Sequence, residues 1–501
     1  MSNLSDLLPA GASAKQLTFT DSGSGITSKK PVVLESDGDV TEVSSTAISA
    51  SITAQGAFNS VNTNAWNDSC YDSNSNRLVI VYVAVHPGGY NALYAILGTI
   101  ASNGTISYGT PALVYGNGSF QVSSCATCFD STNNKVIIGY TRASSYQGIA
   151  LVCTVSGDSI SFGSETTFES GNVNETIRMA FDSVNGKTVI CYRDAGDSNK
   201  PKGIVGTTSG TSISFGSAIT IQSTQIQAAC GIGFDSNSGQ VVFAYRDNNN
   251  SYYGTCAVGT VSGTSLEWGN TVVFESANVQ AIVPKIPFDS KNNKLVFVYA
   301  YSDNDGYAKV GTLSGTSYSA TITFGSSAEF ENANIDFPAA AYDSNAQKVN
   351  IFYADQGNSN YGTYVLGTVS GTSISFNSPV VFRSAQISKN ATTFTIEGRT
   401  ANPYTDHGNS FYGSNLIYQG AYTSTNLTAT NFVGIADSAI SASAAGSVIV
   451  QGGTVAGLSS LTAGSKYYVQ IDGTFGTTAA DPSVSAGLAI STTSLLLNGD
   501  S

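Results

Sequence analysis

Short runs of consecutive apolar residues recur along most of the chain, and polar, turn-forming stretches separate them. Val241-Val242-Phe243-Ala244 is one such run, and KLVFVYAY from Lys294 is another. A strand with one face in water alternates apolar and polar residues, whereas a continuously apolar strand has both faces covered. The pattern therefore predicts an all-β chain whose short strands are buried on both faces.

Two short phrases accompany these runs in a fixed phase. The first contains Phe-Asp-Ser or Tyr-Asp-Ser and is clearest in FDSVNGKTVICYRDAG from Phe181. Its aspartates are Asp72, Asp130, Asp182, Asp235, Asp289 and Asp343, so the successive differences are 58, 52, 53, 54 and 54 residues. The second phrase is GTTSGTSISFG from Gly206, which recurs from Gly259 and Gly367 and, more loosely, at Gly98, Cys153 and Gly311. Two phrases that keep step in this way identify a repeat protein.

Each repeat divides into four predicted strands, a to d. Strand a ends at the Asp-Ser phrase, a tight turn leads to strand b, and a longer polar loop leads to strand c, such as YGTCAVGTV from Tyr253. A Ser-Gly-Thr turn then leads to strand d, such as the run from Ser265 to Phe274. Four antiparallel strands in about 54 residues, covered on both faces, predict a β-propeller blade. A β-solenoid is the alternative, although its coils are usually shorter.

The propeller is predicted to have six or seven blades. Six copies of the Asp-Ser phrase are clear, and residues 385–425 are strand-like but lack both phrases. A predicted strand at 45–60 precedes the first copy, where an outer strand d belongs. Seven blades close the ring if 45–60 supplies the outer strand of the last blade and 385–425 supplies the rest, and we favour this arrangement.

The regions outside the repeats predict a second, smaller β domain. Residues 31–34 read as a strand followed by the turn signal Asp37-Gly38, which indicates a hairpin. After residue 425 the phrases stop, and four further short strands are expected, at 447–450, 466–471, 486–490 and 494–497. The predicted division is an N-terminal arm at 1–23, a split base domain at 24–44 plus 426–501, and a propeller head at 45–425.

Composition narrows the classes of function. The chain has 501 residues, of which 41% are hydrophobic and 11% charged, and its net charge is −13. This balance argues against nucleic acid, whose phosphates need Lys and Arg, and against an anionic membrane surface. No apolar stretch approaches the roughly 20 residues of a membrane helix, and the N-terminus lacks the pattern of a signal peptide. We expect synthesis and folding in a reducing cytosol, no membrane insertion, and seven cysteines that behave as buried small hydrophobes.

The Asp-Ser phrase has two interpretations, a metal site and a turn. Asp72, Asn74 and Asn76 have a D-x-N-x-N spacing, but calcium loops need a rigid run of oxygen ligands and usually a later bidentate acid. The other copies lack this spacing, and Asp and Asn side chains also bond their own backbone in tight turns. We favour the turn, with no metal and no cofactor.

The end of strand b and the loop that follows it carry aromatic, charged and amide residues. In a propeller the b–c and d–a loops share one face, opposite the Asp-Ser turns. Aromatic rings stack on the C–H faces of sugars, while amides, acids and guanidiniums pair hydroxyls, so this face is a candidate glycan-binding surface. The alternative, which is favoured, is that Arg and Asp pair between blades as spacers. The candidate ligand-binding residues are Tyr192, Arg193, Asp194, Tyr245, Arg246, Asp247, Tyr252, Asp303, Tyr307, Tyr353, Asp355 and Tyr361.

Catalysis has little support in the sequence. A sialidase-like propeller needs several Arg that converge on a carboxylate together with a Tyr/Glu pair, and Arg193 and Arg246 occupy repeat-equivalent positions. The histidines, His86 and His407, fall in different loops, and we find no nucleophile elbow, P-loop or Rossmann signature. We predict that the protein is not an enzyme.

The base segments carry a series of short motifs. Residues 30–40 read K-P-V-V-L-E-S-D-G-D-V, and later segments read FVGIA at 432–436, LTAGSKYYV at 461–469 and DG at 472–473. Together they resemble a small β module common in bacteriophage virion proteins, in which the hairpin and the later motifs lie close together in the chain. The resemblance covers about 90 residues and implies that the propeller is inserted into the base. The propeller repeats themselves resemble no named family.

The resemblance implies a bacteriophage virion structural protein of the tail-fibre or head-decoration type. Its base is then expected to dock on other virion proteins, and its propeller to contact a host-surface glycan or receptor. A capsid-decoration or head-fibre protein without a receptor role is the alternative, and a glycan-cleaving enzyme is a third, less favoured one. Homo-oligomers through the base are compatible with this interpretation because fibres are commonly symmetric.

Overall fold

The computed structural model describes residues 16–63, 67–116, 122–143, 145–301, 304–391, 393–394 and 398–497. The regular structure in these ranges is β-strand, apart from four short 3-10 helices: η1 (Ala195–Asp197), η2 (Ser317–Ser319), η3 (Gln356–Asn358) and η4 (His407–Asn409). The prediction of an all-β chain is therefore confirmed. In the same ranges, no helix has the length and apolar character needed to cross a membrane.

The chain divides into two compact units. One comprises residues 50–420, and the other combines residues 1–49 with 421–501. The predicted propeller boundaries, 45 and 425, lie outside the first unit because β4 (Ser45–Ile48) pairs with β39 (Tyr422–Thr425) in a separate two-stranded ribbon. The single strand predicted at 45–60 is consequently two strands, β4 and β5 (Ser51–Asn62).

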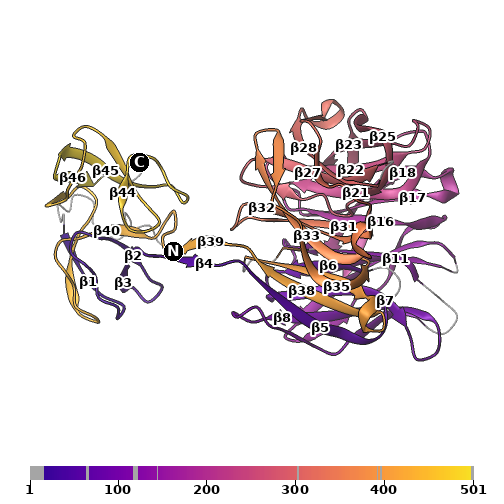
Figure 1. The fold of residues 1–501 in the computed structure, drawn as a ribbon, viewed down its shortest axis with the longest axis horizontal. Coiled ribbons are helices and arrows are strands. Elements are labelled where there is room, and N and C mark those ends of the chain that lie inside the picture. The colour runs from indigo at the N-terminus through magenta and orange to yellow at the C-terminus, as the bar shows by residue number, and fades with distance from the viewer. Residues whose placement is uncertain are drawn as a thin grey trace. The chain divides into compact units, whose positions relative to one another are not determined.

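The smaller unit, the base, is built from both ends of the chain, so its strands are indigo and yellow in Figure 1. Its first sheet has the order β1 (Gln16–Thr20), β41 (Ala445–Ile449), β40 (Phe432–Ala436), β2 (Pro31–Leu34), β3 (Val40–Glu42). Its second sheet has the order β42 (Thr454–Ala456), β46 (Ser494–Leu497), β45 (Val484–Ser491), β43 (Lys466–Val469), β44 (Phe475–Gly476). The two sheets share a buried core that includes Val33, Ile435 and Leu495.

The predicted N-terminal arm at 1–23 is wrong in its second half. Residues 1–15 lie outside the described ranges, but β1 pairs antiparallel with β41, from Gln16 opposite Ile449 to Thr20 opposite Ala445. Leu17 and Phe19 pack against a second buried cluster of the base. The alternating pattern of Gln16–Thr20 therefore serves an edge strand of the base sheet.

The larger unit is a β-propeller, and strand pairing groups its described strands into seven antiparallel modules. Modules 1 to 3 are β6 (Asn67–Asp72), β7 (Arg77–Val85), β8 (Asn91–Ile100), β10 (Ala112–Tyr115); β11 (Val122–Asp130), β12 (Lys135–Arg142), β13 (Gly148–Ser156), β15 (Thr166–Glu169); and β16 (Val173–Asp182), β17 (Lys187–Asp194), β18 (Lys200–Ser209), β20 (Ile219–Thr220). Module 4 is β21 (Ile226–Asp235), β22 (Gln240–Asp247), β23 (Tyr253–Ser262) and the first half of β25 (Val272–Ile282). Module 5 is the second half of β25 with β26 (Phe288–Asp289), β27 (Lys294–Tyr301), β28 (Gly306–Ser314) and β30 (Ala328–Glu331). Module 6 is β31 (Ile335–Asp343), β32 (Lys348–Asp355), β33 (Tyr361–Ser370) and the first half of β35 (Val380–Ser388). Module 7 is the second half of β35 with β36 (Thr393–Phe394), β37 (Arg399–Asp406), β38 (Tyr412–Gln419) and β5.

The a strands of successive modules are neighbours, and they form a closed sequence. β6 contacts β11, β11 contacts β16, β16 contacts β21, and the series continues through β26 and β31 to β36, which contacts β6 again. In the last module β5 supplies the outer strand and pairs with β38, with Ser51 opposite Gln419. The strand that precedes the first repeat thus completes the module that follows the last one.

Strand d differs from its prediction. The run from Ser265 to Phe274 is broken into β24 (Ser265–Trp268) and the start of β25, and both pieces pair with β23. The break falls at Gly269, where a Cβ atom would lie 1.8 Å from the carbonyl oxygen of Ala320 in the next module. Only glycine permits so close an approach of two backbones. The same split occurs at β9 (Ile106–Tyr108), β14 (Ser159–Phe162), β19 (Ser212–Phe215), β29 (Thr321–Phe324) and β34 (Ser373–Phe376).

The aspartates of the repeat phrase organise the turns between strands a and b. Oδ1 of Asp182 accepts the backbone N–H groups of Val184 and Asn185, at 3.0 and 2.9 Å. The same pair of bonds occurs at Asp72, Asp130, Asp235, Asp289 and Asp343. These hydrogen bonds confirm the interpretation of the phrase as a turn.

Candidate functional site

The propeller contains a cavity of about 310 Å³ at its centre. Each of the seven modules contributes to its lining through its strand a or the residues that flank it. Much of the wall is apolar, and a few charged and amide groups stand among small side chains. The polar lining residues are Asn67, Asp68, Arg178, Gln280, Lys285, Asp336, Lys389 and Asn390. A concave, mostly apolar site with a few polar groups is the usual form of a small-ligand pocket, and this volume is at the lower end of their range, roughly 300–1,000 Å³.

The depth of each lining residue follows from its place in strand a. The a strands run from the face of the b–c loops toward the Asp-Ser turns, so lining residues further from the Asp-Ser phrase lie nearer the b–c face. Gln280 and Asp336 are therefore near the mouth. Asp68, Arg178 and Lys285 each precede an Asp-Ser aspartate by four residues and lie deeper. The cavity thus lies on the side of the propeller that the sequence singled out.

An ion pair crosses the ring at the deeper level. Lys285 Nζ, from the fifth module, lies 2.8 Å from Asp68 Oδ1 of the first module. It also donates a short hydrogen bond to the carbonyl oxygen of Ser69. Asp68 Oδ2 accepts the backbone N–H of Thr127 at 2.8 Å, which ties the second module to the same group. The pair, called here the cross-ring ion pair, neutralises two of the charges in the lining.

Local backbone geometry explains how Lys285 reaches the axis. Pro284 has no N–H, and the regular pairing of the fifth module is interrupted between β25 and β26. The chain here bonds to the fourth module instead, because Ile232 N–H donates to Pro284 O at 3.0 Å and Ile286 N–H donates to Ile232 O at 2.7 Å. The displaced segment carries Lys285 toward the first module.

Arg178 presents part of its guanidinium to the cavity. Its Nε donates to the carbonyl oxygen of Cys230 at 2.8 Å, and Nη1 donates to that of Ile177 at 2.9 Å. These bonds fix the side chain between the third and fourth modules. Within the described part of the chain, no hydrogen bond uses its Nη2, so this donor remains available to a ligand.

Asn67 adds an amide with unmet hydrogen-bonding capacity. Both Oδ1 and Nδ2 are shielded from solvent and have no partner among the described residues. Because neither atom is accessible to solvent, including solvent in the cavity, Asn67 contributes to the wall through its other atoms. Beside it, burial raises the pKa of the Cys125 thiol and keeps it neutral. Cys125 and the surrounding alanines therefore form an apolar wall.

The mouth of the cavity carries a second group of polar residues. Lys389 Nζ lies 4.6 Å from the centre of the Phe337 ring, and Asp336 accepts a hydrogen bond from Gln356. Phe337 and Lys389 both have positive φ, 49° and 55°. Irregular pairing within strand a, between Asp336 and Ala339 of β31, turns this segment toward the axis.

The tyrosines predicted as ligands at the end of strand b are structural, which corrects the prediction. Tyr192, Tyr245 and Tyr353 are fully buried. The Tyr192 hydroxyl lies 2.9 Å from Glu169 Oε2 on β15, and burial together with this carboxylate raises the pKa of Tyr192. Equivalent bonds join Tyr245 to Gln222, Tyr299 to Glu275 and Tyr353 to Glu331, each in the preceding module, whereas Tyr140 bonds Glu165 of its own module. The repeated bonds therefore tie strand b to the neighbouring blade, and the buried hydroxyls cannot reach a ligand at the surface.

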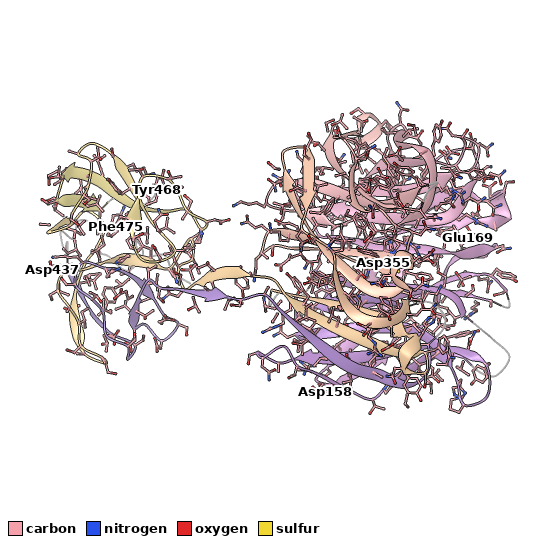
Figure 2. All side chains as sticks on the ribbon, in the orientation of Figure 1. Asp158, Glu169, Asp355, Asp437, Tyr468 and Phe475 are labelled. Carbon is pink, nitrogen blue, oxygen red and sulfur yellow. The ribbon has the colours of Figure 1, made fainter. Side chains whose placement is uncertain are left out.

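The predicted aspartates serve turns at the same loops. Asp194 accepts the backbone N–H of Asp197 at 3.1 Å and pairs with Lys202 at 2.6 Å. Asp247 accepts the N–H of Asn249 and Asp355 that of Asn358, both at 3.1 Å. Figure 2 labels Asp355 and Glu169, both in the propeller unit. Asp303 lies outside the described residues.

The remaining predicted residues lie around the rim of the b–c face and not in the cavity. Arg193 donates to Asn199 Oδ1 at 3.0 Å. Tyr307 is nearly buried and stacks on Tyr301, with ring centres 4.3 Å apart. Arg246 lies over the ring of Tyr252, which is 38% exposed. Tyr361 is half-buried at the start of β33. The bonds of Arg193, Asp194 and Arg246 lie within their own modules, so they do not support the spacer interpretation, in which Arg and Asp pair between blades; Tyr252 remains accessible.

Sequence reasoning missed the charged residues of the cavity. The signal that could have found them is a charged residue at a repeat position where the other copies have a small side chain. Four residues before the Asp-Ser aspartate, three repeats have Asp68, Arg178 and Lys285, whereas the others have Ala126, Gly231 and Ala339.

Comparison with known proteins adds information on the fold alone. No family model and no curated protein matches the chain. The NanB sialidase from Streptococcus pneumoniae has a TM-score of 0.40 and 12% identity, over 73% of this chain and 70% of that one. AofleA from Arthrobotrys oligospora has a TM-score of 0.40 and 8% identity, over 69% of this chain and 94% of that one. A leech intramolecular trans-sialidase has a TM-score of 0.40 and 9% identity, over 76% and 70% of the two chains. At these levels the similarities carry no argument about activity or ligand.

Proposed function

We propose that the propeller binds a saccharide in the central cavity and that the chain acts by recognition, without cleaving its ligand. The observation that carries the proposal is an unengaged donor on a mostly apolar cavity wall, Arg178 Nη2. A guanidinium donates to sugar hydroxyls. The alanine-rich wall suits the apolar C–H face of a sugar ring, and about 310 Å³ suits one small ring.

Recognition is favoured over hydrolysis by the commitments of the other charged groups. Asp68 is held by Lys285 and by the Thr127 N–H, and Asp336 is held by Gln356. The Tyr/Glu pairs that a sialidase mechanism needs are present at repeat positions, but their tyrosines are fully buried between neighbouring blades. A hydrolase would instead need an acid and a second carboxylate free to face the bond being cleaved.

The biological setting of the proposal rests on the base. The motifs at 30–40 and 432–473 resemble a base module of bacteriophage virion proteins, so we place the chain in the virion, with the base docked on other virion proteins and the propeller displayed to a host-surface glycan. The base and the propeller are separate compact units, which is the organisation that such display requires.

The test is binding of the full-length chain to a printed array of bacterial surface polysaccharides. Arg178→Gln removes the charge and Nη2, and Arg77→Gln is the matched control because Arg77 pairs with Asp158 beside the Asp-Ser turns. We expect wild type and Arg77→Gln to bind the same saccharides and Arg178→Gln to bind about tenfold more weakly, the loss of one good polar contact. Equal binding by all three chains would remove the cavity as the site, and release of free sugar from the bound saccharide would replace recognition by catalysis.

A further inference from the structure

A second feature of the b–c face recurs around the ring. In six modules, one residue of the b–c loop has a left-handed backbone with φ between 55° and 63°: Tyr146, Asn199, Tyr252, Asn304, Asn360 and Phe411. The carbonyl oxygen of each accepts a backbone N–H at 2.7–3.0 Å from strand a of the next module, except that for Phe411 the donor is Thr63, which precedes strand a, at 2.8 Å. The six residues are thus equivalent positions, fixed in the same conformation by the same bond.

The identity of the residue at this position divides the modules into two groups. Asn adopts the left-handed conformation readily, because its short side chain tolerates it, whereas a bulky aromatic residue there is an outlier. Three modules have Asn, and three have Tyr146, Tyr252 or Phe411. Because the Asn modules prove that the turn forms without an aromatic ring, the turn itself does not require one. Strained residues that the fold does not need mark functional positions.

The three aromatic rings, called here the rim aromatics, are accessible. Tyr146 is 45% exposed, Tyr252 is 38% exposed and Phe411 is 40% exposed. Each therefore keeps a substantial part of its ring in water, in contrast to the buried tyrosines of strand b. Exposure of an apolar ring in a strained conformation has a cost in stability.

Neighbouring polar groups hold two of these rings in place. The Arg246 guanidinium lies 4.4 Å from the centre of the Tyr252 ring, and Arg246 Nη2 donates to Asn278 Oδ1 at 2.8 Å. The His407 ring lies 4.5 Å from the Phe411 ring, and His407 Nε2 lies 2.9 Å from Ser388 Oγ. A fixed ring beside guanidinium, amide and hydroxyl groups presents a flat apolar surface next to hydrogen-bonding groups.

We infer that the rim aromatics are additional sugar-stacking sites, which lets the b–c face bind several residues of a polysaccharide at once. This inference rests on the proposed saccharide recognition and extends it to an extended, repeating glycan. A sugar ring offers both a C–H face and hydroxyls, which matches a single ring with polar neighbours. A protein partner would favour one contiguous apolar core, whereas Tyr146 and Tyr252 belong to modules 2 and 4, separated by the Asn199 module.

The experiment replaces the aromatic residues with the residue of the sibling modules. The triple variant Tyr146→Asn, Tyr252→Asn, Phe411→Asn is made in the full-length chain. Tyr318→Asn is the matched control, because Tyr318 is 72% exposed and lies in η2, in a c–d turn on the opposite face. Binding is measured on the polysaccharide array and by surface-plasmon titration with the bacterial polysaccharide that gives the strongest signal, and melting temperature is measured for each chain.

We expect the triple variant to bind the polysaccharide at least tenfold more weakly, because linked subsites raise avidity by about 10²–10⁴. Its melting temperature should be unchanged or higher, and Tyr318→Asn should bind like wild type. Undiminished binding by the triple variant overturns the inference, and so does a lower melting temperature, which would make the rings structural. If the triple variant binds normally while Arg178→Gln binds weakly, only this inference fails. If wild type binds no polysaccharide, the proposed function fails with it.

Discussion

At the scale of single residues, most polar side chains of the propeller are committed to its own backbone or to a neighbouring strand. In the turns of Asp130, Asp182 and Asp289, the side-chain amide of the Asn three residues further on donates to Oδ2 of the aspartate; Asn185, for example, donates to Asp182 at 2.8 Å. Asp343 has Ala346 at that place, and its Oδ2 is buried without a partner. Burial raises the pKa of Asp343 above its usual range. Equivalent turns of the repeat therefore differ in how well the buried aspartate charge is stabilised.

This difference predicts opposite effects of one substitution at two equivalent positions. Asp343→Asn keeps the acceptor for both backbone N–H groups and removes an unpaired buried charge, so it should leave stability unchanged or raise it by about 1 kcal/mol at pH 7. Asp182→Asn leaves the Asn185 amide without its acceptor and should lower the free energy of unfolding by about 1–2 kcal/mol. Urea unfolding of both variants measures the two values.

The pH dependence of the stability gained by Asp343→Asn follows from the raised pKa of Asp343. The folded state binds the Asp343 proton more tightly than the unfolded chain does, so the charged carboxylate weakens the fold above its folded pKa and the penalty disappears as pH falls through that value. Any advantage of Asp343→Asn should therefore shrink in acid. An advantage that grows as pH falls would contradict the assignment.

At the scale of strands, the sequence was informative because the signal is local. Apolar runs, the Asp-Ser turn and the Ser-Gly-Thr turn predicted strands a to c, since each depends on residues near in the chain. Strand d was predicted as one piece because nothing near Gly269 reveals the backbone of Ala320 in the next module. The strand b tyrosines were misassigned for a related reason. The partner of Tyr192 is Glu169, which lies on β15, the outer strand of the preceding module.

These Tyr bonds predict how strongly strand b is tied to the neighbouring segment. Tyr192→Phe leaves the Glu169 carboxylate without its hydroxyl donor and should cost about 1.5–3 kcal/mol, as for a bond to a charged group. Tyr245→Phe removes a bond to the neutral Gln222 and should cost about 0.5–1.5 kcal/mol. Chemical denaturation ranks the pair, and a larger loss at Tyr245 would show that burial alone, not the partner's charge, sets the effect.

At the scale of the whole molecule, ring closure brings together groups that are remote in the chain. Lys285 and Ser69 are 216 residues apart, yet they are hydrogen-bonded across the axis. Such a contact has no local signal, which is why the cavity residues were not predicted from the sequence. The split base has the same origin, since β1 and β41 meet only because the propeller returns the chain to its starting point.

The cross-ring ion pair should contribute to the stability of the closed propeller. Lys285→Met leaves Asp68, whose side chain is 13% exposed, without its cation and should lower the free energy of unfolding by about 1–3 kcal/mol. Adding Asp68→Asn removes the orphaned charge and should recover part of that loss. Thermal and urea unfolding of the single and double variants provide the values. A double variant that is less stable than Lys285→Met would mean that Asp68 acts mainly through Thr127.

The central claim is that a saccharide occupies the cavity at the centre of the propeller. The most direct measurement is an experimentally determined structure of the full-length chain with the saccharide that the array selects. The account predicts a sugar ring in the cavity, within hydrogen-bonding distance of Arg178 Nη2, with its C–H face on the alanine wall. A saccharide bound elsewhere on the chain, with ordered water alone beside Arg178, would contradict it.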